Sequence, residues 1–185
     1  MREAIEIPDA TLEPDAYVQA LLATLGDRDA LEVYAETPRA VRRLCSAVTD
    51  AMWPVPLAPG EWNARQIVGH LLDVDIVYGF RWRLILTEDE PAYPGYNEKA
   101  WSLLARVPAT QLLDSFAGLR DVNVELMRSL HPEDWHRSGV HGEQGREDVR
   151  RMLDKIAGHD LAHLNQLERT LSVAFGGSAA ASASR

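Results

Sequence analysis

The stretch HDLAHLNQLERTL, residues 159–171, carries two histidines four positions apart in a segment with the spacing of an amphipathic helix. At about 100° per residue, His163 lies about 40° from His159 around the helix axis. Ile156 and Leu167 fall within about 80° of His159 on the same side. Both histidines are therefore predicted on the apolar face that a helix buries in a bundle, where each imidazole needs a partner.

The histidine pair alone leaves two interpretations open. The two side chains are either buried histidines satisfied by hydrogen bonds or half of a metal site. A third histidine favours the metal site, because His70 lies in a long helical stretch, EWNARQIVGHLLDVDIVYGFRWRL, residues 61–84. Ile67 and Val74 fall within about 60° of His70, so this histidine is also on a buried face. One helix thus offers one ligand and another offers two at i,i+4, as a three-histidine site in a bundle requires.

The remaining patterns predict an all-α protein, a four-helix bundle with a short N-terminal helix. The leading helix covers YVQALLATLG. The next helix has Thr37 as N-cap and Pro38 at its first position, with RDALEVYAE before it as an extension bent at the proline. The other three main helices are expected at about 63–87, 109–130 and 146–174. Two longer connections separate them, which fits a bundle, and residues 136–141 are the part that could be extended.

Composition indicates one globular domain, residues 1–175, followed by a flexible tail, GGSAAASASR, at 176–185. The 19 Lys and Arg against 28 Asp and Glu give a net charge of −9, which argues against nucleic acid as a partner. No run reaches the roughly 18 apolar residues of a membrane span, so no membrane partner is expected. The start lacks a signal-peptide pattern and the chain has one cysteine, Cys45, so we expect a cytoplasmic protein with an inert, packed thiol.

Two segments of the chain resemble the DinB-like superfamily, which includes YfiT-type metal-dependent hydrolases and bacterial thiol transferases. These segments are GEWNARQIVGHLLDVD at 60–75 and HDLAHLNQL at 159–167. The spacing from Trp62 to His70 and the connection EDEPAYPGYNEKAW are also similar to the family. The resemblance covers roughly residues 28–172.

The resemblance implies a four-helix bundle, frequent homodimers, and a metal site with His70, His159 and His163 as ligands. Three neutral imidazoles suit Zn, Ni, Cu or Fe, and we expect a divalent metal, Zn or Ni. Three protein ligands leave a coordination position open, as in catalytic zinc sites. A metal held in this way lowers the pKa of water to about 7 and acts similarly on a thiol.

The predicted function is therefore that of a metal-dependent enzyme, either a thiol-dependent S-transferase or a hydrolase, acting on a small molecule. Its partner is that small-molecule substrate, with a low-molecular-weight thiol suggested by the family resemblance. The alternative is a non-catalytic stress-response bundle that binds a metal or a small ligand. No catalytic residue is assigned. Asp160 directly follows a ligand but points about 100° away from it, and it replaces the longer Glu of the metalloprotease pattern H-E-x-x-H.

Two polar side chains are predicted to support the ligands. Gln166 lies one turn past His163, and Asp73 lies one turn past His70, about 60° around the helix. Either could orient the second ring nitrogen of a ligand.

A substrate pocket is predicted to involve residues on two helices and the connection between them. Arg81 either binds an anionic substrate group or pairs with a carboxylate inside the bundle. Tyr96 and Trp101 either wall the pocket or pin the connection to the bundle. Asn123 interrupts an apolar stripe and makes either a buried bridging hydrogen bond or a substrate contact. The loop histidines His131, His136 and His141 are expected to be solvated rather than to bind the metal, and of these His141 is the best candidate to approach the site.

Overall fold

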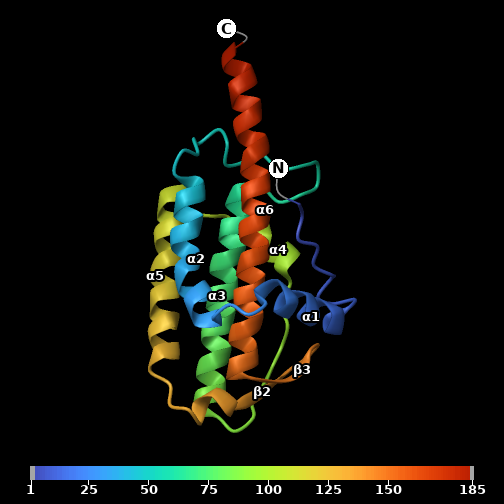
Figure 1. Ribbon diagram of the computed structural model, residues 1–185, viewed down its shortest axis with the longest axis vertical. Coiled ribbons are helices and arrows are strands. Elements are labelled where there is room, and N and C mark those ends of the chain that lie inside the picture. The colour runs from blue at the N-terminus through green and yellow to red at the C-terminus, as the bar shows by residue number, and fades with distance from the viewer. Residues whose placement is uncertain (1–2, 184–185) are drawn as a thin grey trace.

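Four long helices lie side by side along the long axis of the protein in this computed structural model, which describes residues 3–183 and side chains up to residue 176 (Figure 1). They are α2 Ala30–Cys45, α3 Ala64–Thr87, α5 Ala109–Arg128 and α6 Val149–Ala183. Helix α6 packs against α2 and α3, and α5 covers the other side of α2 and α3. The predicted four-helix bundle is confirmed.

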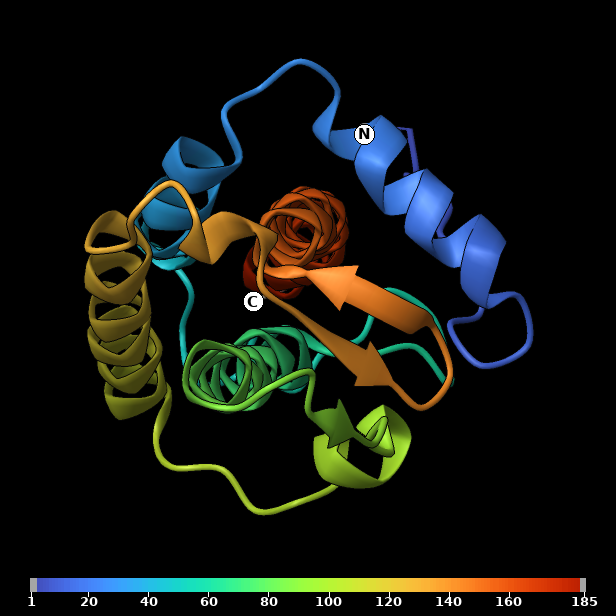
Figure 2. The same cartoon turned by 90° about the horizontal axis from the view of Figure 1, so that it is seen from below.

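Two shorter helices lie outside the bundle. Helix α1, Pro14–Leu25, packs against α6, and the short α4, Glu98–Ser102, packs against α3. Figure 2 shows α6 near the centre of the molecule, with α1 on the opposite side from α5. The faces of α3 and α6 that α5 does not cover are thus bordered by α1 and α4.

Helix α3 begins as the sequence predicts. The side chain of Asn63 accepts a hydrogen bond from the backbone nitrogen of Gln66 at 3.0 Å, and the Gln66 side chain accepts one from the Asn63 nitrogen at 3.1 Å. This capping box satisfies two of the donors that a helix start leaves unpaired. It fixes the start of the helix that carries His70.

The predicted N-cap of α2 at Thr37 was wrong, whereas the predicted extension over RDALEVYAE, residues 28–36, is helical from Ala30. The helix begins at Ala30, and Asp29 is its N-cap, accepting a hydrogen bond from the backbone nitrogen of Glu32 at 2.9 Å. Pro38 lies inside the helix. The Thr37 hydroxyl donates to the Val33 carbonyl at 2.9 Å, so Thr37 bonds backwards along the helix and caps nothing.

A small sheet lies at one end of the bundle. Strand β1, Ala92–Tyr93, pairs in parallel with β2, Ser138–His141, which forms an antiparallel hairpin with β3, Gly145–Asp148. Extended structure was anticipated near β2, whereas β1 and β3 were not, because they are very short and β3 is polar. Gly145 has a positive φ of 74°, which suits glycine at the hairpin.

Helix α6 starts three residues later than predicted because Gly145–Asp148 forms a strand. The flexible tail predicted for 176–185 stays a prediction, since the side chains after residue 176 and the whole of 184–185 lie outside the described residues. Among the helices described, none combines the length and apolar character that crossing a membrane requires.

Candidate metal centre

The three histidines predicted as metal ligands converge between α3 and α6. One ring nitrogen from each of His70, His159 and His163 lies within 4.8 Å of the other two. The Nε2 atoms of His70 and His159 are 3.0 Å apart. His70 and His159 are buried, and His163 is half-buried. The arrangement brings three imidazole nitrogens from two helices close enough to share one ion after small adjustments of the rings.

Gln166 supports the cluster as predicted. Its Oε1 lies 2.8 Å from Nδ1 of His163. A carbonyl oxygen only accepts, so this contact assigns the proton of the neutral His163 ring to Nδ1 and leaves Nε2 free as a ligand. A hydrogen bond of this kind fixes both the tautomer and the orientation of a metal-binding histidine.

The surroundings keep all three rings neutral, which is the form that binds a metal. Burial lowers the pKa of His70 and of His159 well below the usual value, and repulsion between a protonated ring and a protonated His163 adds to the effect on each. Burial also lowers the pKa of His163 to about 4, although its hydrogen bond to Gln166 opposes the shift. The donor set therefore fits a divalent metal: three uncharged nitrogens with no lysine or carboxylate among them.

The buried Nδ1 of His159 has no hydrogen-bond partner within the described residues. His70 has a close aromatic neighbour, because the ring centroid of Trp62 lies 4.8 Å from that of His70. Trp62 also stacks on His163, with centroids 6.1 Å apart and ring planes 20° apart. The indole ring thus lies against one side of the histidine cluster.

Asp73 was predicted to orient a ligand ring, but it pairs with an arginine instead. Both of its carboxylate oxygens accept hydrogen bonds from Arg106, at 2.7 and 2.5 Å. Arg106 comes from the connection between α4 and α5, which no helical periodicity could place. Its guanidinium passes beside Gly69, where a Cβ atom would lie only 2.7 Å from Nε of Arg106. Arg106 therefore lies close to the turn that carries His70, and its positive charge helps to lower the pKa of that ring.

A second glycine brings α1 up to the site. A Cβ atom on Gly158 would lie 2.0 Å from the carbonyl oxygen of Leu21, so only glycine allows this approach of α1 to α6. The contact places Tyr17 of α1 in the lining of two cavities that also contain His159. The sequence signal for this contact was a glycine inside a helical pattern, which marks a close packing contact.

The two cavities have volumes of about 640 and 420 Å³. The larger is bordered by α1, α3, α4 and the β2–β3 hairpin, and the smaller by the segment before α1 and by α6. Five residues line both: Asp9, Ala10, Tyr17, Glu98 and His159. The smaller cavity also contains His163 and Gln166. The histidine cluster is therefore reached from cavities large enough for a small molecule.

The residues predicted to form the pocket fall into two groups. Arg81 and Tyr96 line the larger cavity, and so does His141, which is buried rather than solvated. Trp101 is absent from the lining of this cavity and packs against Tyr96 with ring centroids 4.8 Å apart. Of the two roles expected for Asn123, the structure shows the buried bridging hydrogen bond, in which Asn123 donates to the backbone oxygen of Asp75 at 3.0 Å. Asn123 is absent from the lining of the larger cavity.

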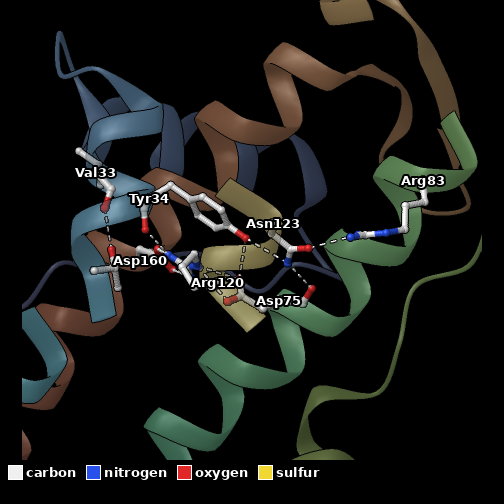
Figure 3. A network of polar contacts seen from close by, with 8 residues as sticks. Val33, Tyr34, Asp75, Arg83, Arg120, Asn123 and Asp160 are labelled. Atoms are coloured by element: carbon white, nitrogen blue, oxygen red, sulfur yellow. Dashed lines mark hydrogen bonds and ion pairs between the residues drawn. The ribbon is translucent and has the colours of Figure 1, made fainter. Parts of the chain in front are cut away.

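A buried polar network joins the four helices of the bundle (Figure 3). Arg120 of α5 donates from Nε to Asp75 of α3 at 2.8 Å and from Nη1 to Asp160 of α6 at 2.6 Å. The hydroxyl of Tyr34, on α2, donates to Asp75 at 2.8 Å. Asp160 points away from the ligands, as the helical geometry predicted. Burial raises its pKa to about 6, although Arg120 opposes the shift.

Comparison with known proteins points to one family. The profile of the DinB superfamily matches residues 33–167. The chain is similar to the "Putative metal-dependent hydrolase YfiT" of Bacillus subtilis (strain 168), with 28% identity over 148 residues, covering 76% of this chain and 83% of that protein. It is also similar to a "Putative metal-dependent hydrolase" of Bacillus mycoides (strain KBAB4), with 26% identity, covering 84% of this chain and 92% of that protein.

The fold matches a solved structure from the same group. That structure is YfiT from Bacillus subtilis, described as a probable metal-dependent hydrolase with an unusual four-helix bundle topology. The two share a TM-score of 0.73 and 27% identity, over 80% of this chain and 86% of the other.

Proposed function

Because this chain belongs to the DinB superfamily, we propose that it is a metal-dependent enzyme that hydrolyses a small molecule in the cavities beside the three histidines. The observation that carries this proposal is the position of His159, which belongs to the histidine cluster and also lines both cavities. A metal that only braced two helices would need no cavity at its ligands. The names of the relatives support hydrolysis as the reaction class.

We propose Zn or Ni as the metal, bound by His70, His159 and His163, because neutral imidazoles suit both ions. Such an ion supplies a Lewis acid that polarises a carbonyl group and lowers the pKa of water or of a thiol. The protein's own part is to hold the three rings neutral, to orient His163 through Gln166, and to enclose the reacting group between α1, α3 and α6.

Glu98 is our candidate for the proton acceptor. It lines both cavities together with His159. Burial raises its pKa above the usual value, and the neighbouring carboxylates Asp9 and Glu143 add to the effect. A raised pKa brings a carboxylate nearer to the operating pH, which favours general base catalysis. Glu98→Gln is expected to lower turnover without changing metal content, whereas Glu143→Gln, at the rim of one cavity, should change turnover much less.

Thiol transfer is the second candidate reaction. It is favoured by the size of the larger cavity, about 640 Å³, which leaves room for a low-molecular-weight thiol beside an electrophile. The same three ligands would serve both reactions, since the ion lowers the pKa of a thiol as it does that of water. A non-catalytic bundle that stores or senses metal is the remaining alternative.

One experiment separates these functions. Protein purified without a histidine tag is analysed for metal and screened for hydrolysis of esters and amides and for thiol transfer, beside His163→Ala. The matched control is His131→Ala, which removes an exposed histidine from a loop. Turnover that disappears in His163→Ala and stays in His131→Ala supports an enzyme. A large fall in melting temperature with chelator, beyond the mass-action stabilisation by a bound ligand and without metal-dependent turnover, favours a structural site.

We also propose that the protein forms a homodimer. The resemblance to the DinB-like family supports it, and so do two exposed apolar side chains one turn apart on α3, Ile76 and Phe80. Light scattering should show about twice the monomer mass of 20.6 kDa. A monomer at micromolar concentration counts against the dimer.

A further inference from the structure

We propose that the substrate of the larger cavity carries a carboxylate, which pairs with Arg81. This inference concerns the same site and so rests on the proposed function. Arg81 lines the cavity that also contains His159.

Arg81 is a buried cation, and its side chain has a single hydrogen bond within the described part of the chain. Only 4% of its surface is exposed. Its Nη2 donates to the carbonyl oxygen of Pro94 at 2.7 Å. The guanidinium carbon lies 5.0 Å from the ring centroid of Tyr93 and 5.7 Å from that of Tyr78. Among residues 3–176, no carboxylate lies within ion-pair distance of it.

The other buried cations of the described residues are paired. Arg120 binds both Asp75 and Asp160, and Lys155 binds Glu147. Buried charges are normally paired, because a buried charge loses its hydration and only an opposite charge or hydrogen bonds can replace that stabilisation. Glu147, a buried carboxylate in the hairpin beside the cavity, is already engaged by Lys155 and by the hydroxyl of Tyr93. Arg81 thus has no ion-pair partner among the described residues, and a carboxylate in the cavity would supply one.

A second polar group in the same lining also lacks a partner. The hydroxyl of Tyr96 is buried and makes no hydrogen bond with the described residues. A carboxylate has two oxygens and can accept from several donors at once. A phenol and a guanidinium in one cavity thus offer complementary donors to a single anionic group.

The charges around the cavity favour a single negative charge over a doubly charged phosphate. Its lining contains three carboxylates, Asp9, Glu98 and Glu143, against two cations, Arg81 and Lys99. A dianion would meet a lining that is already negative overall. A carboxylate brings one charge, and its planar shape matches the forked donors of a guanidinium.

The position of Arg81 also separates the carboxylate from the histidine cluster. Arg81 follows His70 by eleven residues on α3, which corresponds to roughly 16 Å along the helix axis. The carboxylate would therefore lie far from the reacting group. Binding energy from such a remote group can be used to position the reacting end.

The test measures binding in protein stripped of metal with a chelator, so that it does not depend on turnover. Calorimetric titrations use ω-phenyl carboxylates of increasing chain length, the matching primary amides and the matching alkyl phosphates. The wild type is expected to bind at least one carboxylate about tenfold or more tightly than its amide, as a hydrogen bond to a charged group predicts. It should bind that carboxylate more tightly than the phosphate.

Two variants locate the effect. Arg81→Gln should remove the preference for carboxylate over amide, and Lys99→Gln should keep it, although it removes a cation from the same cavity. If circular dichroism shows that Arg81→Gln is unfolded, Arg81→Lys is tested in its place. Lysine keeps the positive charge but lacks the two parallel N–H donors of the guanidinium, so the preference for carboxylate over amide should fall severalfold. The proposal is overturned if no carboxylate is preferred over its amide, if the phosphates bind more tightly, or if the Arg81 variant retains the full preference.

The same compounds separate this inference from the proposed function. If neutral and carboxylate-bearing esters are hydrolysed at equal rates in a metal-dependent reaction, the proposed hydrolase is supported and the proposed role of Arg81 is contradicted. If carboxylates bind in a manner that depends on Arg81 but no ester, amide or thiol is turned over with metal, the binding site is supported and the proposed enzyme is contradicted.

Discussion

The ring nitrogens of His70 and His159 lie 3.0 Å apart, although 89 residues separate the two histidines in the chain. They come from different helices, so their distance depends on how α3 and α6 are positioned along their axes. That position is held on the other side of the helices by Arg120, which binds Asp75 five residues after His70 and Asp160 directly after His159. The metal centre and the polar network thus share the same two helices.

Removing the side-chain amide of Gln166 is expected to weaken metal binding about 10–100-fold, because hydrogen bonds to ligand histidines have effects of that size. Gln166→Leu leaves all three ligands in place and frees Nδ1 of His163 from its partner. Metal affinity, measured by competition with a chromophoric chelator, checks the prediction. Gln111→Leu makes the same change at an exposed site on α5 and should leave the affinity unchanged. Equal affinities of the two variants would show that Gln166 does not position the ligand.

Replacing Arg120 by Met should destabilise the protein by about 3–5 kcal/mol, since it leaves two buried carboxylates without their cation. The control is Arg42→Met, because Arg42 pairs with Asp114 on the surface, where 46% and 70% of the two side chains are exposed. An exposed pair of this kind contributes about 0–1 kcal/mol. Urea unfolding followed by circular dichroism compares the two variants. A similar loss of unfolding free energy in both variants would mean that the buried ion pairs of Arg120 stabilise the protein no more than an exposed pair does.

Gly158→Ala should displace α1 and destabilise the protein by roughly 1–3 kcal/mol, as overpacking does. The added methyl group would meet the Leu21 carbonyl oxygen at 2.0 Å, and backbone atoms cannot move aside as a flexible side chain can. Gly118→Ala is the matched control, since Gly118 lies inside α5 with no atom within 4 Å of the added Cβ. That change should stabilise the helix by about 0.5–1 kcal/mol. Opposite shifts in melting temperature are therefore expected, and shifts of the same sign would contradict the contact.

Cys45 is expected to be unreactive in the native protein at neutral and mildly alkaline pH. Burial raises the pKa of its thiol to about 12, so the nucleophilic thiolate is scarce until the pH approaches that value. Iodoacetamide labelling, followed by mass spectrometry, should be slow in the folded protein and fast in urea. Rapid native labelling at pH 8 would show that the thiol is accessible and ionised.

Helical periodicity was sufficient to predict the main helices and the convergence of the three histidines. His70, His159 and His163 each share a helix face with apolar residues. Such a face can be recognised from the spacing of neighbouring residues alone. The starts of α3 and α5 could also be predicted from local sequence, because Asn63 and Pro108 directly precede them. The start of α2 did not, because Thr37 and Pro38 also fit the interior of a helix that begins eight residues earlier.

The parts that sequence could not predict depend on contacts between distant segments. Arg106 reaches Asp73 from a connection without periodicity, and α1 approaches α6 only through the missing side chain of Gly158. Glu98 and Tyr17 come to the cavities on short or separate elements whose placement no spacing encodes. Asn123 lies on an inward face as expected, but whether an inward amide meets a ligand or a backbone carbonyl is decided by the neighbouring helix.

The adjacency of His159 and Asp160 limits how the protein can admit a substrate. A rotation or slide of α6 that widened the space at His159 would also pull Asp160 from Arg120, so opening by helix motion is costly. The segment before α1 is held more weakly, by the side chain of Asn165, which accepts from the nitrogen of Ile5 at 3.2 Å and donates to the oxygen of Glu3 at 3.0 Å. Entry and release should therefore occur by local opening of this segment. In hydrogen exchange, its amides should exchange far faster than those of the helical turns that carry the ligands.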